Sequence, residues 1–472
     1  MGIGLLLSTV LIIFVFIGEI EAAVSRPEQV MPVSASPEEL PGKSISISEI
    51  PGEDIPSRES PGESPSSDEA SGESASPDIT PRESVFPSET PREESPPGES
   101  SRDSMAADEK EVIPEKGENK KGDEREELEE IRIRQILDQM DLKDKVYQMF
   151  IVFADTLTGA SNTTIAGEAT KKALKKYPVG GILYLTGNLK SEDQAKAMLQ
   201  GIQSFSEVPL FLASDEEGGR VARVKKALGT YEMKAMFYYK DQGSDLAYDN
   251  ARQIAKAIHD LGFNTAFAPV ADVWSYPENT VIADRAYSDD FEEAAKLIPA
   301  AVQGFQDGGV VCSLKHFPGH GSTKSDSHHG SAYVYKTLEE LRKEEFLPFQ
   351  AGIDAGADMV MVGHLLVPEI DDVPATISPK IITDILRNEL NYSGVVITDA
   401  LNMKAMTDYY GSGEIAVRSV KAGADILLCP ADLERSANAL LQAVQKGEIT
   451  QERIDESVKR ILHLKLQRGI IP

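Results

Sequence analysis

Eight short apolar segments, separated by longer amphipathic stretches, are the feature that most constrains the fold of this chain. Segments such as "ADMVMVG" and "GVVITDA" are dense in aliphatic residues, whereas "LAYDNARQIAKAIHDLG" repeats its apolar residues at helical spacing. Strands that alternate with helices form a parallel sheet. The eight segments are KVYQMFIVF, VGGILYL, LFLASD, FNTAFAPVADV, VVCSLKHF, ADMVMVG, GVVITDA and ADILLC.

Eight such units predict a single (β/α)8 barrel of the α/β class. An open doubly wound sheet is the alternative, but it usually has fewer strands and a glycine-rich phosphate-binding turn. The sequence contains neither GxGxxG nor GxxxxGK[ST]. The barrel is therefore the favoured architecture.

The first 124 residues of the chain have a different composition from the rest. Residues 1–24 begin "MGIGLLLSTVLIIFVF", an apolar run typical of an export signal or an N-terminal membrane anchor. Residues 25–124 are rich in proline, serine and glutamate, and such a segment cannot bury enough apolar surface to fold. We predict a disordered acidic spacer there, a catalytic barrel over residues 125–472, and a location outside the cytoplasm or on the outer face of the cell membrane.

The charge balance excludes one class of partner. The chain has a formal net charge of −29, and the segment from Val24 to Glu130 has 29 acidic and 11 basic residues, a net charge of −18. Nucleic-acid binding needs a basic surface to neutralise phosphates. We therefore expect no nucleic acid as a partner.

Polar side chains recur where the predicted strands end. In a parallel barrel these carboxyl ends meet at one face, which holds the active site. Charged or imidazole groups at the same end of five successive strands predict one shared site there. The residues concerned are Asp215, Glu216, Glu217, Arg220 and Arg223 after the third strand, Asp272 and Arg285 after the fourth, Lys315 and His316 at the fifth, His364 at the sixth and Asp399 at the seventh.

The stretch "KHFPGHGSTKSDSHHG" holds four of the seven histidines of the chain. A metal site is one interpretation, but His316 and His320 flank a Pro-Gly turn rather than sharing a helix face. A structural role in fixing the loop is a second, and it suits His320 and His329. The third is an acid/base pair, in which Asp326 fixes the tautomer of His328 and raises its basicity.

Asp399 follows the apolar run Val395-Val396-Ile397. A carboxylate held by a rigid strand and aimed into a barrel mouth suits a nucleophile or an electrostatic stabiliser. The alternative is a helix N-cap for the segment "ALNMKAM". Asp399 by itself does not decide between the two.

Four motifs together resemble glycoside hydrolase family 3, in its β-N-acetylglucosaminidase branch. They are "DEEGGRVAR", "FAPVADV", "KHFPGHGSTKSDSH" and "ITDALNM", and the resemblance extends from about Leu137 to the end. KHFPGHG followed by DSH is highly specific, and the order and spacing of the motifs also fit. The resemblance implies a retaining glycosidase that needs no cofactor.

The resemblance also implies roles for individual residues. Asp399 matches the nucleophile that forms a covalent glycosyl-enzyme, His328 the acid/base catalyst and Asp326 its partner. The residues that match substrate contacts are Asp215, Arg223, Arg285, Lys315 and His316. One departure is Ala332, where the family commonly has proline, and it leaves the resting position of the histidine loop open.

We therefore expect an exported exo-β-N-acetylglucosaminidase. Its expected substrate is a carbohydrate, namely N-acetylglucosamine-capped peptidoglycan fragments or small aryl or chito-oligosaccharide glycosides, and the N-terminus is expected to attach it to a membrane or cell wall. Three alternatives stay open: a glycoside phosphorylase on the same fold, a non-catalytic surface sugar-binding protein, and a metal-dependent hydrolase.

Overall fold

The computed structural model describes residues 116–324 and 330–472, with side chains from residue 127 onward. The predicted signal or anchor at residues 1–24 and most of the predicted spacer lie outside the described residues. Helix α1 begins at Lys116, earlier than the predicted barrel boundary at residue 125. Its lysine- and glutamate-rich sequence combines good helix formers with opposite charges at helical spacing.

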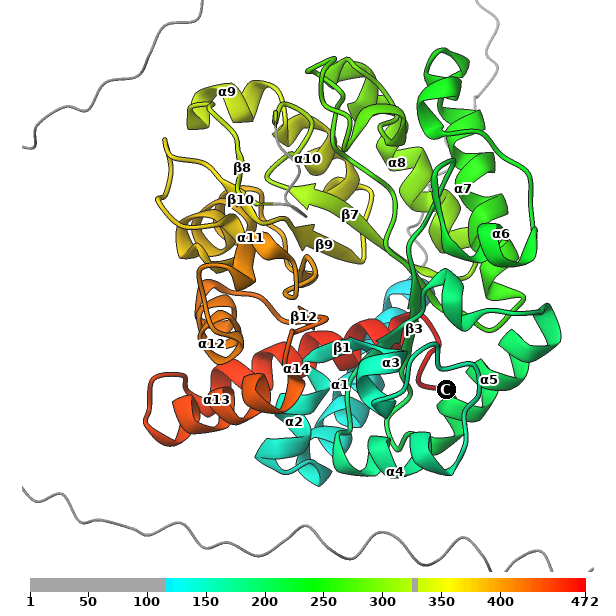
Figure 1. Cartoon of the computed structure of the whole chain (residues 1–472), viewed down its shortest axis with the longest axis vertical. Coiled ribbons are helices and arrows are strands. Elements are labelled where there is room, and N and C mark those ends of the chain that lie inside the picture. The colour runs from blue at the N-terminus through cyan, green and yellow to red at the C-terminus, as the bar shows by residue number, and fades with distance from the viewer. Residues whose placement is uncertain (1–115, 325–329) are drawn as a thin grey trace, which may run out of the picture. The chain divides into compact units, whose positions relative to one another are not determined.

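Eight parallel strands form one sheet at the centre of the molecule, in the order β11-β9-β7-β6-β3-β2-β1-β12 (Figure 1). Each of the eight predicted segments contains one of these strands, so the predicted (β/α)8 class is confirmed. The strands are β1 (Phe150–Phe153), β2 (Gly181–Leu183), β3 (Phe211–Ser214), β6 (Thr265–Ala266), β7 (Val311–Phe317), β9 (Met359–Val362), β11 (Val395–Thr398) and β12 (Leu427–Leu428).

The sheet closes between its two end strands. Ile397 in β11 forms a parallel bridge with Ile426, directly before β12. Backbone hydrogen bonds from Thr398 to the Ile426 carbonyl (3.0 Å) and from Asp425 to the Val396 carbonyl (2.8 Å) extend this contact. Closure brings the carboxyl ends of all eight strands to one barrel face, which we call the mouth.

Helices surround the barrel and bury its outer surface (Figure 1). Apart from α1, the longer helices are amphipathic, and their apolar sides face the barrel. The helices are α1 (Lys116–Gln139), α2 (Leu142–Gln148), α3 (Ala154–Thr158), α4 (Glu168–Lys176), α5 (Glu192–Phe205), α6 (Arg223–Leu228), α7 (Ser244–His259), α8 (Phe291–Asp307), α9 (Leu338–Lys343), α10 (Phe346–Asp354), α11 (Lys404–Thr407), α12 (Ser412–Ala422), α13 (Leu433–Gln445) and α14 (Gln451–Gln467).

Shorter elements occupy the loops that follow the strands. Two small sheets lie there, β4 (Glu216–Gly218) with β5 (Val221–Ala222) and β8 (Ala332–Tyr333) with β10 (Leu365–Leu366). The remaining helical turns are η1 (Thr186–Asn188), η2 (Met236–Gln242), η3 (Ala283–Arg285), η4 (Ala375–Ile377) and η5 (Lys380–Glu389).

The first predicted strand was wrong in its first half. Residues of "KVYQMFIVF" before Met149 belong to helix α2, and only the second half forms β1. The Asp141 carboxylate caps α2 by accepting from the Asp144 amide at 2.8 Å. This cap starts a helix that runs directly into the strand. The prediction missed the helix because the density of aliphatic residues alone does not separate a helix from a strand.

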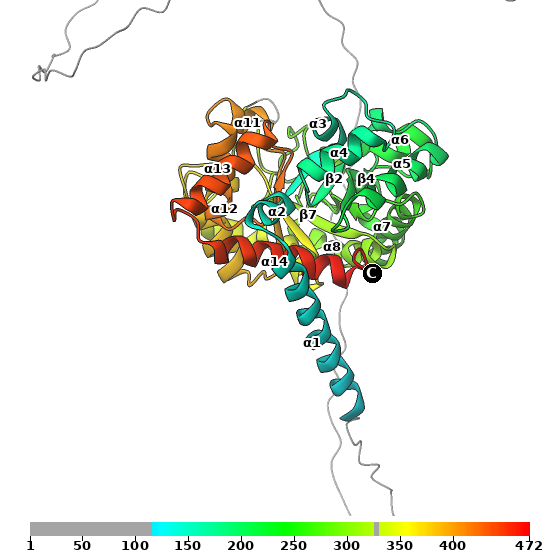
Figure 2. The same ribbon diagram turned by 90° about the horizontal axis from the view of Figure 1, so that it is seen from below.

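Helix α1 packs along α14 and extends away from the barrel (Figure 2). Ile133 is buried, and Glu130 pairs with Lys459 at 2.9 Å. Figure 2 shows α1 leaving on the face opposite α3 and α11, which follow the carboxyl ends of β1 and β11. The chain therefore enters the barrel from the face opposite the mouth. Within the described part of the chain, no helix is both long and apolar enough to cross a membrane.

Lys465 is a fully buried lysine on α14. Its Nζ donates to Gln148 Oε1 (3.2 Å) and to the Gly180 carbonyl (3.0 Å), and it faces the Phe211 ring. Burial lowers the pKa of Lys465 to about 7. The unfolded chain keeps this proton up to its ordinary value of 10.5. Unfolding between pH 7 and 10 therefore takes up a proton, so stability should rise with pH in this window.

We expect the free energy of unfolding of the wild type to rise between pH 7 and pH 10 by about 3 kcal/mol more than that of Lys465→Met. Methionine fills a similar volume and has no group that titrates. Urea unfolding of both proteins at several pH values measures the difference. If the free energy of unfolding changed with pH equally in the two proteins, Lys465 would be protonated throughout this range in the folded protein, and this prediction would be contradicted.

Candidate active site

The predicted site residues that the structure describes lie at the mouth of the barrel. Asp215 follows β3, Lys315 and His316 are in the carboxyl half of β7, and Asp399 follows β11. Lys315 Nζ lies 3.1 Å from Asp215 Oδ1, which joins groups that are distant in sequence. Lys315 and Asp215, which come from different strand ends, are therefore in contact in the structure. The roles predicted for these residues remain predictions.

Glu217 is the centre of a buried ion-pair network. It lies in β4, just after β3, and its carboxylate accepts two hydrogen bonds from Arg285, at 2.8 Å from Nε and 2.9 Å from Nη2. Lys315 Nζ lies 2.5 Å from Glu217 Oε1. Burial would raise the pKa of Glu217, but the charges of Arg285 and Lys315 outweigh burial and hold it well below its ordinary value. Glu217 is thus a permanent anion.

Lys315 connects this buried pair to the open side of the mouth. Its side chain is only 3% exposed, yet its pKa is raised, because Glu217 and Asp215 outweigh the desolvation that would lower it. Asp215 is partly exposed, and its other oxygen lies 4.0 Å from Arg223 Nη2. The charges alternate along Arg223, Asp215, Lys315, Glu217 and Arg285. We call this set the ion-pair chain.

His316 is fixed by a buried carboxylate. Asp272 Oδ2 lies 2.6 Å from His316 Nδ1 and accepts the His316 amide at 3.0 Å, while Oδ1 accepts the His320 amide at 2.7 Å. Burial would raise the pKa of Asp272, but His316 and these hydrogen bonds lower it. The ionised Asp272 keeps the proton of His316 on Nδ1, and Nε2 is then the nitrogen left for a ligand.

The first half of the histidine loop is held by structural contacts. The ring of His320 is buried, and its Nδ1 lies 2.7 Å from Thr323 Oγ1. Asn279 Nδ2 donates to the carbonyls of His320 (2.9 Å) and Gly321 (3.0 Å). Burial and the neighbouring His316 lower the pKa of His320 to about 4, so this ring is neutral at pH 7. These contacts support the structural interpretation of His320.

The second half of the histidine loop contains the predicted acid/base pair, Asp326 and His328. Asp326, His328 and His329 lie outside the described residues. No group of three metal-binding side chains occurs in residues 127–324 or 330–472. The absence of a metal and the roles of Asp326 and His328 therefore remain predictions.

Asp399 is not a helix N-cap, which removes the alternative considered from sequence. Helix α11 begins at Lys404 and its N-cap residue is Met403. Asp399 is half-buried, its amide donates to the Val362 carbonyl (2.9 Å), and its Oδ1 accepts from the Ala400 amide (2.7 Å). A rigid strand end and its own turn thus hold the carboxylate.

His364 and Cys429 are further constraints around Asp399. The buried His364 ring pairs through Nδ1 with Thr376 Oγ1 (2.7 Å) and donates from Nε2 to the Ala400 carbonyl (2.9 Å), which fixes the turn after Asp399. Burial raises the pKa of the Cys429 thiol well above its ordinary value, and the charges of Asp215 and Asp399 raise it further. Asp215 directly follows β3 and Asp399 directly follows β11, so both carboxylates lie at the carboxyl ends of barrel strands.

Two carboxylates of the site received no role from sequence. Glu217 and Asp272 were recognised only as polar residues at strand ends, yet they hold Arg285, Lys315 and His316 in place. Their position directly after buried strands was the available signal. The sequence did not show that Glu217 pairs with Arg285, because the two residues are distant along the chain.

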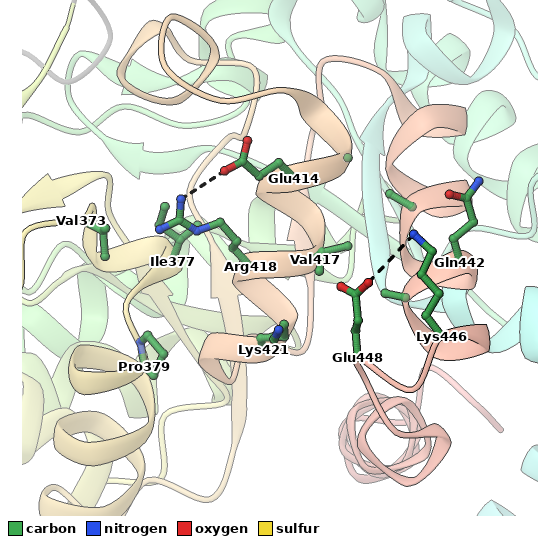
Figure 3. A pocket seen from close by; sticks show the side chains of 13 residues that line it. Val373, Ile377, Pro379, Glu414, Val417, Arg418, Lys421, Gln442, Lys446 and Glu448 are labelled. Carbon is green, nitrogen blue, oxygen red and sulfur yellow. Dashed lines mark hydrogen bonds and ion pairs between the residues drawn. The ribbon is translucent and has the colours of Figure 1, made fainter. Parts of the chain in front are cut away.

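A separate groove lies on the helices outside the barrel (Figure 3). It has a volume of about 600 Å³ between α12 and α13. Four of its charged side chains form two pairs, Glu414 with Arg418 at 3.2 Å and Lys446 with Glu448 at 4.0 Å. None of the predicted site residues lines this groove, and we assign it no chemistry.

Comparison with known proteins gives a consistent picture. Residues 141–464 match the glycosyl hydrolase family 3 N terminal domain. Beta-hexosaminidase A of Pseudoalteromonas piscicida is 34% identical over 336 residues, which cover 65% of this chain and 56% of that protein. Beta-hexosaminidase of Stenotrophomonas maltophilia (strain K279a) is 35% identical over 295 residues, covering 61% of this chain and 86% of the relative.

A solved structure agrees with these relatives. The glycoside hydrolase family 3 beta-N-acetylglucosaminidase from Paenibacillus sp. str. FPU-7 superposes with a TM-score of 0.67 and 38% sequence identity. The alignment covers 71% of this chain and 64% of that one. The chain thus spans a little over half of the Pseudoalteromonas relative and somewhat less than two thirds of the Paenibacillus protein.

Glu217→Gln should lower the free energy of unfolding at pH 7 by about 3–5 kcal/mol, because it leaves Arg285 and Lys315 buried without their counter-charge. Since the pKa of Glu217 is depressed, its contribution is complete above its ordinary value of 4.5 and is lost as the pH falls further. Urea unfolding measures the change.

The matched control is Glu293→Gln, which removes the exposed ion pair with Lys296. It should change stability by about 0.5 kcal/mol or less. Equal stability of Glu217→Gln and wild type would show that the ion-pair chain does not depend on this carboxylate.

Proposed function

We propose, from the premise that this chain belongs to glycosyl hydrolase family 3, that it is an exo-acting β-N-acetylglucosaminidase. The family predicted from the four motifs is confirmed. Support for the activity comes from the relatives named beta-hexosaminidase and from the Paenibacillus beta-N-acetylglucosaminidase. The observation in this chain that carries the proposal is Asp399, a half-buried carboxylate at the carboxyl end of β11, on the barrel face where β3 and β7 carry Asp215 and Lys315.

The proposed reaction has two steps and retains the configuration at the anomeric carbon. First, an Asp399 oxygen bonds to C1 of the terminal N-acetylglucosamine while the glycosidic C–O bond breaks, and the leaving oxygen takes a proton from His328. Second, water gives a proton to His328 and its oxygen displaces Asp399 from C1. Asp326 orients His328 and raises its basicity. The roles of Asp326 and His328 rest on the DSH motif.

The ion-pair chain suits the binding of sugar hydroxyls. Asp215 offers acceptor oxygens, and Arg223, Lys315 and His316 offer a guanidinium, an ammonium and an imidazole around them. Arg285 donates three N–H groups, two to Glu217 and one to the Val281 carbonyl. One N–H group on each terminal nitrogen then remains for a ligand. Because each charge is already balanced by a neighbour, the site is ordered before substrate binds.

We extend the proposal to location and natural substrate. The apolar residues 1–24 and the acidic spacer would place the barrel outside the cytoplasm, where peptidoglycan fragments capped by N-acetylglucosamine occur. The chain enters the barrel on the face opposite the mouth (Figure 2), so helix α1 does not cover the site.

Asp399→Asn should lower kcat for 4-nitrophenyl β-N-acetylglucosaminide by about 10⁴-fold, because the amide cannot form the glycosyl ester. Release of nitrophenol measures the rate. Asp408→Asn, which changes an exposed carboxylate on the same loop, should keep the wild-type rate. A full rate in Asp399→Asn would remove this residue as the nucleophile.

The same assay separates the alternatives. Added phosphate that converts the product to a sugar phosphate would identify a phosphorylase. Loss of the rate in EDTA would identify a metal-dependent hydrolase. An inactive wild type that still binds N-acetylglucosamine would identify a sugar-binding protein. The proposal expects an active wild type that releases free N-acetylglucosamine both with added phosphate and with EDTA.

Azide should distinguish the two catalytic roles by stereochemistry. In Asp399→Gly, azide can occupy the space of the carboxylate and attack C1 directly, so we expect an α-glycosyl azide. In His328→Gly, Asp399 still forms the intermediate, and azide should give a β-glycosyl azide. Proton NMR of the products reads the anomer. The opposite assignment of anomers would exchange the two roles.

A further inference from the structure

Three exposed tyrosines gather beside the mouth of the barrel. Tyr333 is 39% exposed, Tyr335 76% and Tyr409 64%. Large aromatic rings exposed together on a surface commonly mark a binding site rather than a solvated face. None of the three belongs to the ion-pair chain or to the predicted acid/base pair. We call them the rim tyrosines.

The backbone presents Tyr333 and Tyr335 on one outward face. Ala332 and Val334 are fully buried, so side chains alternate inward and outward along this segment. The two outward rings are stacked, with centroids 5.6 Å apart and planes inclined by only 6°. Stacking covers part of one face of each ring, and Tyr335, which is the more exposed of the two, leaves most of its surface open to solvent.

These rings belong to the loops that surround Asp399. Tyr333 is paired with Leu366 in the small β8–β10 sheet, and β10 starts directly after His364, which fixes the turn that follows Asp399. Tyr409 lies just after α11 on the loop of Asp399, and Ser331 Oγ lies 3.4 Å from its hydroxyl. Figure 1 shows β8, β10 and α11 grouped along one edge of the barrel.

The rim tyrosines offer aromatic faces and hydroxyls. Lys336, the basic residue next to Tyr335, is bound by Glu344 and Glu345 and lies over the Phe291 ring. This lysine is therefore already paired and does not make the stacked rings an anion site. A pyranose suits this surface, because its axial C–H groups stack on an aromatic ring while its hydroxyls remain hydrogen-bonded.

We propose that the rim tyrosines bind the leaving-group sugars of a β-linked N-acetylglucosamine oligosaccharide. This inference rests on the proposed function, because a sugar bound at the ion-pair chain directs the rest of the oligosaccharide out of the mouth. The preferred substrates are then oligosaccharides that extend beyond the sugar next to the cleaved bond, not the shortest glycosides.

The test compares N,N′,N″,N‴-tetraacetylchitotetraose with methyl β-N-acetylglucosaminide, which has no sugar in its leaving group. In Tyr335→Ala and Tyr409→Ala, kcat/KM for the tetrasaccharide should fall about tenfold, mainly through KM, since one aromatic contact is removed. For the methyl glycoside, kcat/KM of both variants should stay within about twofold of the wild-type value.

Two controls exclude trivial effects. Tyr335→Phe keeps the ring and should keep at least half of the tetrasaccharide rate. Tyr248→Ala removes a tyrosine on the helices outside the barrel, where its hydroxyl bonds Asp307 at 2.9 Å, and it should behave as wild type. Equal effects on both substrates, or none on either, would overturn the proposal.

Binding measurements separate this proposal from the proposed function. If wild type cleaves neither substrate, the glycosidase proposal fails, and calorimetric titration with the tetrasaccharide still tests the rim tyrosines. Weaker binding of the tetrasaccharide by Tyr335→Ala than by Tyr335→Phe supports sugar binding by the rim tyrosines. Identical binding by both variants overturns it.

Discussion

The buried pairing of Glu217 with Arg285 and Lys315 is the interaction on which the arrangement of the site depends. Two cations that are almost fully enclosed by protein would be unstable without this carboxylate. With it, Lys315 remains charged and extends the network to Asp215 at the open side of the mouth. A sugar with several hydroxyls then meets groups whose positions and charges are already set.

The parallel barrel is what makes this network possible. Closure through Ile397 and Ile426 brings every strand end to one face, so residues separated by long stretches of sequence become neighbours. Backbone contacts to Val362 and Ala400 hold Asp399 at the end of β11. The rim tyrosines lie further along the loops that carry these groups. In our proposal, this position connects the binding of the terminal sugar with the binding of the sugars that follow it.

Much of this could be predicted from the sequence, because strand location and strand direction depend on local patterns. All eight strands were located, and Asp399 was placed correctly at a strand end. The helix before β1 was missed, since Val146 and Tyr147 look as apolar as the strand itself. The roles of Glu217 and Asp272 could not be predicted, because they depend on distant partners. Asp326 and His328 still rest on their motif.

The most direct test of the central claim is to trap the glycosyl-enzyme. A 5-fluoro-N-acetylglucosaminyl fluoride should react quickly and then hydrolyse slowly, because fluorine beside the ring oxygen destabilises the oxocarbenium-like transition state while fluoride remains a good leaving group. Mass spectrometry of the digested protein should find one sugar on the peptide that contains Asp399. A sugar on a different carboxylate, or turnover with inversion and no adduct, would contradict the proposed mechanism.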